Sequence, residues 1–154
     1  MIANATWQDA LHVALNMREE DRAEVMATSW SEDPFDFAVE CIRSPGIKLA
    51  VRDENGVAVC IGGVALNQPG IGQAWLVGTP DIGRLGIEVA HAARKIFKTM
   101  MDEGGIHRIQ AHSAAFHSWA HQWLSLVGLK EESRLPKYGK NGEEFIVFSV
   151  LKGD

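Results

Sequence analysis

The stretch Ala74–Phe97, AWLVGTPDIGRLGIEVAHAARKIF, joins a strand-like apolar run, a turn marked by glycines and a long amphipathic helix. Its apolar residues recur at helical spacing after Thr79-Pro80, and Gly104-Gly105 is a typical helix end. The spacing therefore predicts a strand over 73–78 and a helix over 80–103. A strand followed directly by a long helix is typical of proteins in which helices pack on a sheet.

The remaining elements extend this pattern along the chain. Asn55-Gly56 and Asn141-Gly142 are typical hairpin turns between apolar runs. The expected helices are Trp7–Met17, Glu19–Trp30, Phe35–Ile42 and Phe116–Val127. The other expected strands are Ile2–Thr6, Ile47–Arg52, Val57–Leu66, Ile106–Ala111, Ser133–Lys137 and Phe145–Lys152. The order predicts one α/β (α+β) domain over residues 1–154, with a mixed, mostly antiparallel central sheet flanked by helices.

Composition excludes several classes of function. The chain carries 15 Lys and Arg against 20 Asp and Glu, a net charge of −5, which disfavours nucleic-acid binding by a broad basic face. No apolar run approaches the ~18 residues of a membrane span, and the N-terminus lacks the pattern of a signal peptide. Cys41 and Cys60 lie in unlike contexts, so we expect two buried free thiols, as in a reducing compartment.

Three local features of the sequence resemble the GNAT (GCN5-related N-acetyltransferase) family. The opening IANATWQDA is similar to the usual strand that runs into the first helix of that family. The strands before AWLVGT lie where the cofactor-binding strand of the family is expected. The segment SWAHQWLSLVGLKEES is similar to the late helix, with Val127-Gly128-Leu129 in place of Leu-Gly-Phe. The resemblance implies a GNAT-like fold over the whole chain.

A narrower resemblance covers nearly the whole chain. The segments NMREEDRAEVMATSW, AWLVGT and KYGKNGEEFIVFSV are similar to a family of internal virion proteins of short-tailed phages, whose fold is GNAT-like. The most specific piece is the stretch from Asn16 to Val25. This resemblance implies phage origin, a role in virion assembly, contacts with other phage structural or assembly proteins, and location in the virion and host cytoplasm. It does not by itself imply catalysis.

The expected cofactor loop departs from the GNAT pattern. That family binds pyrophosphate with Arg/Gln-x-x-Gly-x-Gly/Ala at a helix N-terminus, and the nearest frame here is GRLGIE, residues 83–88, in which only Gly86 fits. Glu88 would repel pyrophosphate, whereas a carboxylate is favourable at an empty helix N-terminus. Arg84 could offset part of this repulsion. We therefore expect no acetyl-CoA; if the cofactor binds, the resemblance implies a path along Val77, Gly78, Arg84 and Gly86.

The usual proton donor of the GNAT family is also missing. Many members carry a tyrosine four residues before the glycine of Leu-Gly-Phe, and Leu124 occupies that position here. The only tyrosine, Tyr138, lies in the last hairpin, and the central strands offer no carboxylate as a general base. The sequence thus assigns no catalytic residue. An active acetyl-CoA-dependent N-acetyltransferase with an atypical site remains the alternative.

Histidine and tryptophan residues raise further possibilities. His112, His117 and His121 cluster, and the spacing of the last two allows a metal site or imidazole catalysis. Surface or interface histidines are the favoured interpretation, and no metal is predicted. Trp119 and Trp123 form an aromatic stripe at helical spacing. This stripe indicates core packing or, as the alternative, a partner-binding face.

Overall fold

The computed structural model describes all 154 residues. Its contacts divide the chain into two compact units, with residues 1–65 and 75–84 in unit 1 and residues 66–74 and 85–154 in unit 2. The elements in chain order are β1 Ile2–Asn4, α1 Trp7–Leu15, α2 Glu19–Ala27, α3 Pro34–Arg43, β2 Gly46–Arg52, β3 Ala58–Gln68, β4 Ile71–Gly78, the 3-10 helix η1 Pro80–Arg84, α4 Gly86–Glu103, β5 Arg108–Ala114, α5 Ser118–Val127, β6 Lys130–Leu135 and β7 Phe145–Leu151.

The strands form one seven-stranded sheet in the order β1-β2-β3-β4-β5-β7-β6. The pairs β1–β2, β2–β3, β5–β7 and β6–β7 are antiparallel. The pair β4–β5 is parallel, with Ile71 opposite Arg108 and Gln73 opposite Gln110. The predicted mixed, mostly antiparallel sheet flanked by helices is confirmed.

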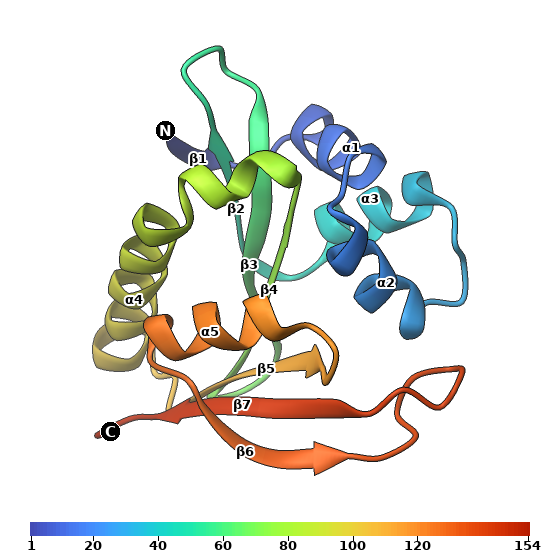
Figure 1. Cartoon of the computed structure of the whole chain (residues 1–154). Helices are drawn as coiled ribbons and strands as arrows, with labels where there is room; N and C mark the ends of the chain where they lie inside the picture. Colours follow the sequence, from blue (N-terminus) through green and yellow to red (C-terminus); the bar gives the residue numbers. More distant parts are fainter. The chain divides into compact units, whose positions relative to one another are not determined.

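Unit 1 groups α1, α2 and α3 beside the strands β2, β3 and β4 (Figure 1). Thr6 and Asp9 form a capping box at the start of α1, and Asp33 caps α3, which begins at Pro34, as expected for proline in a first turn. The core between these helices and strands is made by small and branched apolar side chains. Its buried members are Ala10, Val13, Ala14, Ala38, Cys41, Ala50, Ala58, Ile61 and Val77.

Unit 2 packs α4 against α5, next to the strands β5, β7 and β6 (Figure 1). The indole Nε1 of Trp123 on α5 donates to the carbonyl of Gly86 on α4 at 3.0 Å. Helix α5 ends at Gly128, whose φ of 105° lies in the left-handed region that glycine adopts without strain. Along β5, Ile109 and Ala111 are buried, while the alternate residues are partly exposed. None of the helices is both long and apolar enough to cross a membrane.

The predicted helix over 80–103 is in fact two elements. Ile82 donates to the carbonyl of Thr79 at 3.1 Å, which is the i to i+3 spacing of a 3-10 turn, and the α-helix begins only at Gly86. Thr79 accepts from the N–H of Asp81, so it caps the 3-10 segment and not α4. The strand expected over 133–137 spans 130–135 instead, because pairing with β7 defines it despite its charged residues.

Candidate functional site

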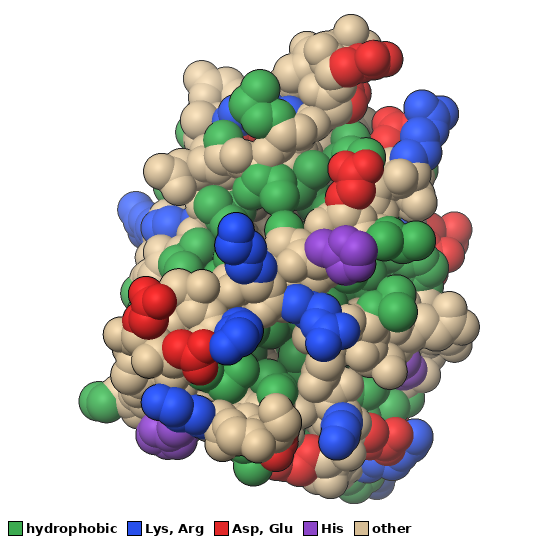
Figure 2. All heavy atoms as spheres, turned by 90° about the vertical axis from the view of Figure 1, so that its left-hand side faces the viewer, with side chains coloured by type: hydrophobic (Ala, Val, Ile, Leu, Met, Phe, Trp, Pro, Cys, Tyr) green, Lys and Arg blue, Asp and Glu red, His purple; other side chains and the backbone are tan.

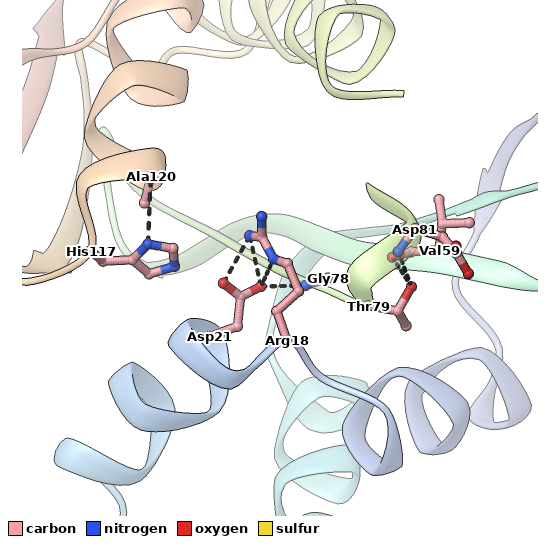
Figure 3. Close-up of polar contacts among 8 residues, drawn as sticks. All are labelled: Arg18, Asp21, Val59, Gly78, Thr79, Asp81, His117 and Ala120. Carbon is pink, nitrogen blue, oxygen red and sulfur yellow. Dashed lines mark hydrogen bonds and ion pairs between the residues drawn. The ribbon is translucent and has the colours of Figure 1, made fainter. Parts of the chain in front are cut away.

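The candidate site in unit 1 is the end of β4, where the turn between α1 and α2 contacts Gly78. The N–H of Gly78 donates to Oδ2 of Asp21 at 2.7 Å (Figure 3). The carbonyl of Gly78 accepts from the N–H of Arg18 at 2.8 Å. Both backbone polar groups of Gly78 are therefore engaged inside the unit, as they would be by a neighbouring strand.

Asp21 is a buried carboxylate with a cationic partner. Its side chain is only 3 % exposed, and that of Arg18 is 14 % exposed. The guanidinium Nη2 of Arg18 lies 2.8 Å from Oδ1 and 3.0 Å from Oδ2 of Asp21. Charge-assisted bonds of this kind are strong, and a buried carboxylate that loses its partner is costly. The Arg18–Asp21 turn is thus anchored firmly to β4.

The neighbours of Gly78 are also held within unit 1. Thr79 directs both its N–H and its hydroxyl to the carbonyl of Val59, at 2.9 Å and 3.2 Å (Figure 3). Val77 is buried in the core. A Cβ placed on Gly78 would lie 2.7 Å from Cδ1 of Ile82. Gly78 and its two neighbours are therefore closely packed.

The remaining residues of the predicted cofactor path belong to different units. In unit 1, Gly83 and Arg84 are exposed, and a Cβ on Gly83 would meet nothing within 4 Å. In unit 2, α4 begins at Gly86 without a side-chain cap, and Glu88 lies in its first turn. On the face drawn in Figure 2, Lys and Arg side chains lie among Asp and Glu side chains.

These residues do not fit acetyl-CoA in the way that the resemblance implies. The donor that Gly78 would offer to the pantetheine arm already binds Asp21. The carboxylate of Glu88 is exposed in the first turn of α4. There it interacts favourably with the helix dipole and would repel a phosphate. Arg84 is the one side chain of the set that suits a phosphate.

The position of the usual proton donor is occupied by an inert side chain. Leu124 is 8 % exposed on α5 and cannot transfer a proton. The ring of Tyr138 instead stacks on that of His112, with centroids 5.6 Å apart and planes 3° apart, and also packs against Phe145. The phenol therefore belongs to the β6–β7 end of unit 2.

The three clustered histidines each have a structural partner. His117 is buried, and its Nδ1 accepts from the N–H of Ala120 at 3.4 Å at the start of α5 (Figure 3). Nε2 of His121 lies 2.9 Å from the carbonyl of Ala114, so this nitrogen carries the proton. No group of three or more His, Cys, Asp or Glu residues could hold a metal ion.

His112 lies at the end of a series of hydrogen bonds in which each side chain donates to the next. The sequence alone did not predict this series. Nε of Arg108 donates to Gln110 at 2.6 Å, Gln110 donates to Gln73 at 3.0 Å, and Nε2 of Gln73 faces Nδ1 of His112 at 2.8 Å. Because arginine only donates, each amide is oriented in turn and Nδ1 of His112 must accept. Burial and, second, the charge of Arg108 lower the pKa of His112. The only sequence signal is the polar alternation Arg108, Gln110, His112.

The exposed fractions of the tryptophan and cysteine side chains show which of them pack in the core. Trp123 is 8 % exposed, which favours core packing over a partner contact, whereas Trp119 is half-buried. Trp30, which the sequence did not single out for a site, is fully exposed. Cys41 and Cys60 are buried free thiols, as predicted, and burial raises the pKa of each to about 12.

No protein-family model and no curated protein matches the chain. Solved structures do match its fold. A ribosomal-protein-S5-alanine acetyltransferase from Vibrio fischeri has a TM-score of 0.71 at 17 % identity, covering 99 % of this chain and 93 % of the other. A GNAT-family acetyltransferase from Bacillus anthracis has a TM-score of 0.75 at 15 % identity, covering 99 % and 95 %. A spermidine N-acetyltransferase variant from Vibrio cholerae has 0.72 at 13 %, covering 99 % and 95 %.

This likeness shows that the chain has a GNAT-like fold. At such identities the likeness concerns the fold alone, because one fold hosts many functions. The narrower resemblance to the phage virion family finds no counterpart among these structures and stays a prediction.

Proposed function

We propose that this chain uses a GNAT-like scaffold to contact other proteins, and that it does not transfer acetyl groups through the standard GNAT residues. The sequence resemblance supports a role in phage morphogenesis, as an internal virion or assembly component present in the virion and host cytoplasm. The partners are then other phage structural or assembly proteins. A degenerate acetyl-CoA site accompanies this role.

One observation carries the proposal: both backbone polar groups of Gly78 form hydrogen bonds, its N–H with Asp21 and its carbonyl with Arg18. Arg18 and Asp21 belong to the stretch NMREEDRAEV, which is also the most specific piece of the phage resemblance. The most specific segment of the phage resemblance is therefore the one that engages the N–H expected to bind pantetheine. Leu124 and Glu88 support the same proposal, because neither suits acetyl transfer.

The second candidate function is an active acetyl-CoA-dependent N-acetyltransferase with an atypical site. It is favoured by the fold, since the matched structures named above are acetyltransferases. The exposed Arg84 beside the open position at Gly83 is the local feature in its support. Under this candidate, the Arg18–Asp21 turn has to release Gly78 before the cofactor enters.

Calorimetry with acetyl-CoA on the purified chain separates the two candidates. We expect no heat of binding at millimolar cofactor, and no difference between the wild type and Arg84→Ala. Arg94→Ala is the matched control, because Arg94 is an exposed arginine on α4, outside the predicted cofactor path. Micromolar binding that is lost in Arg84→Ala and kept in Arg94→Ala would contradict the proposal and favour the acetyltransferase.

A further inference from the structure

Unit 1 exposes two aromatic side chains around the connection between α2 and α3. Trp30 is fully exposed and Phe35 is 51 % exposed. Phe35 and Trp7 pack in a T-shaped arrangement, with ring centroids 5.2 Å apart at an interplanar angle of 77°. Large aromatic side chains are the residues that most often anchor protein contacts.

The α2–α3 connection holds Trp30 in a defined place. The hydroxyl of Ser29 donates to the carbonyl of Val25 at 2.7 Å. On the other side, the hydroxyl of Ser31 donates to Asp36 at 2.6 Å and accepts from the N–H of Asp33 at 3.1 Å. Hydrogen bonds thus fix both neighbours of Trp30. Little additional chain therefore has to become ordered when a partner contacts the indole.

The same part of unit 1 is acidic. Residues 28–43 contain four Asp and Glu against one Arg, a net charge of −3. Asp33, Asp36 and Glu40 are exposed and form no ion pair. Asp36 and Glu40 are one helical turn apart on α3 and so lie on one face.

We propose that the Trp30 surface, made of Trp30, Asp33, Phe35, Asp36 and Glu40, binds a Lys- and Arg-rich segment of a partner protein. This inference rests on the proposed function, in which the chain acts through protein contacts. Cationic side chains gain from stacking on an exposed indole and from the exposed carboxylates of the same segment. The carboxylates extend along α3, over more surface than one small cation covers, and their charge repels nucleic acid.

The probe is a fluorescein-labelled peptide of alternating Lys and Ser, followed by fluorescence anisotropy on the full chain. We expect saturable binding that weakens as salt rises, because the carboxylates are exposed. Trp30→Ala should weaken binding by about tenfold or more, as for an interface anchor. Phe116→Ala is the matched control, an exposed aromatic residue of unit 2, and should bind like the wild type. Glu40→Gln should lower affinity and flatten the salt dependence.

Three outcomes overturn the inference. Equal binding by the wild type and Trp30→Ala means non-specific attraction between opposite charges. Displacement of the peptide by spermidine at an equal affinity means that the occupant is a small polyamine. An absence of saturable binding at low salt means that no basic segment binds. Each outcome leaves the proposed function standing if acetyl-CoA also fails to bind, so the two failures are distinguishable.

Discussion

Gly78 uses its N–H and its carbonyl inside unit 1, and its α-carbon faces the side chain of Ile82. A larger residue here meets Ile82 at once, since an added Cβ would lie 2.7, 3.0 and 3.1 Å from three of its side-chain atoms. The position is therefore constrained by packing. Its glycine is explained without reference to a ligand.

We expect Gly78→Ala to lower the free energy of unfolding by ~1–3 kcal/mol, because an extra methyl group overpacks a buried site. Urea unfolding followed by circular dichroism measures the change. Gly83→Ala is the matched control five residues away, where an added Cβ meets nothing within 4 Å, and it should lose no stability. A loss of the same size in both variants would contradict the packing explanation.

At the scale of elements, helix α1 is fixed at its start by Asp9. Its Oδ2 accepts from the N–H and the hydroxyl of Thr6 at 2.8 Å and 2.9 Å. The guanidinium of Arg52 on β2 donates to the same carboxylate at 2.9 Å and 2.6 Å. One side chain thus joins the helix cap to the sheet, and the bond from Arg52 lowers the pKa of Asp9 below its usual 3.8.

The lowered pKa of Asp9 predicts the direction of a pH effect. A carboxyl group whose pKa is lower in the folded state stabilises the fold above its unfolded pKa. That contribution is lost as the pH falls through the folded pKa. Asp9→Asn should therefore cost ~1–3 kcal/mol at neutral pH, as a lost cap and ion pair, and progressively less below pH ~4.

Urea unfolding at neutral and acidic pH measures the Asp9 effect. Glu54→Gln, at the exposed tip of the β2–β3 hairpin, is the control and should show no such convergence. A constant difference between the wild type and Asp9→Asn at every pH would show that the charge of Asp9 is not what stabilises the cap.

At the scale of the whole molecule, the GNAT-like fold accounts for the chain from end to end, since the matched structures cover 98–100 % of it. The proposed assembly role predicts that the tagged protein sediments with particles or assembly intermediates during infection. Recovery only as a free monomer would sink that role.

Features that depend on neighbouring residues follow from the amino-acid sequence alone. Asp33 and Pro34 start α3, Gly56 turns the β2–β3 hairpin with a φ of 78°, and Gly128 ends α5 with a φ of 105°. Caps, turns and periodicity act over a few residues, so these elements and their order follow from the printed sequence. The mixed sheet followed from that order.

Contacts between groups far apart in the sequence depend on the tertiary structure. Asp21 and Gly78 are 57 positions apart, and nothing local to either residue indicates that one bonds the other. Burial was decided in the same way, because both Trp30 and Trp123 sit in apolar-patterned stretches, yet one is fully exposed and the other is 8 % exposed. Periodicity marks a face as apolar, but sheet register and packing choose what that face contacts, and those depend on the whole chain at once.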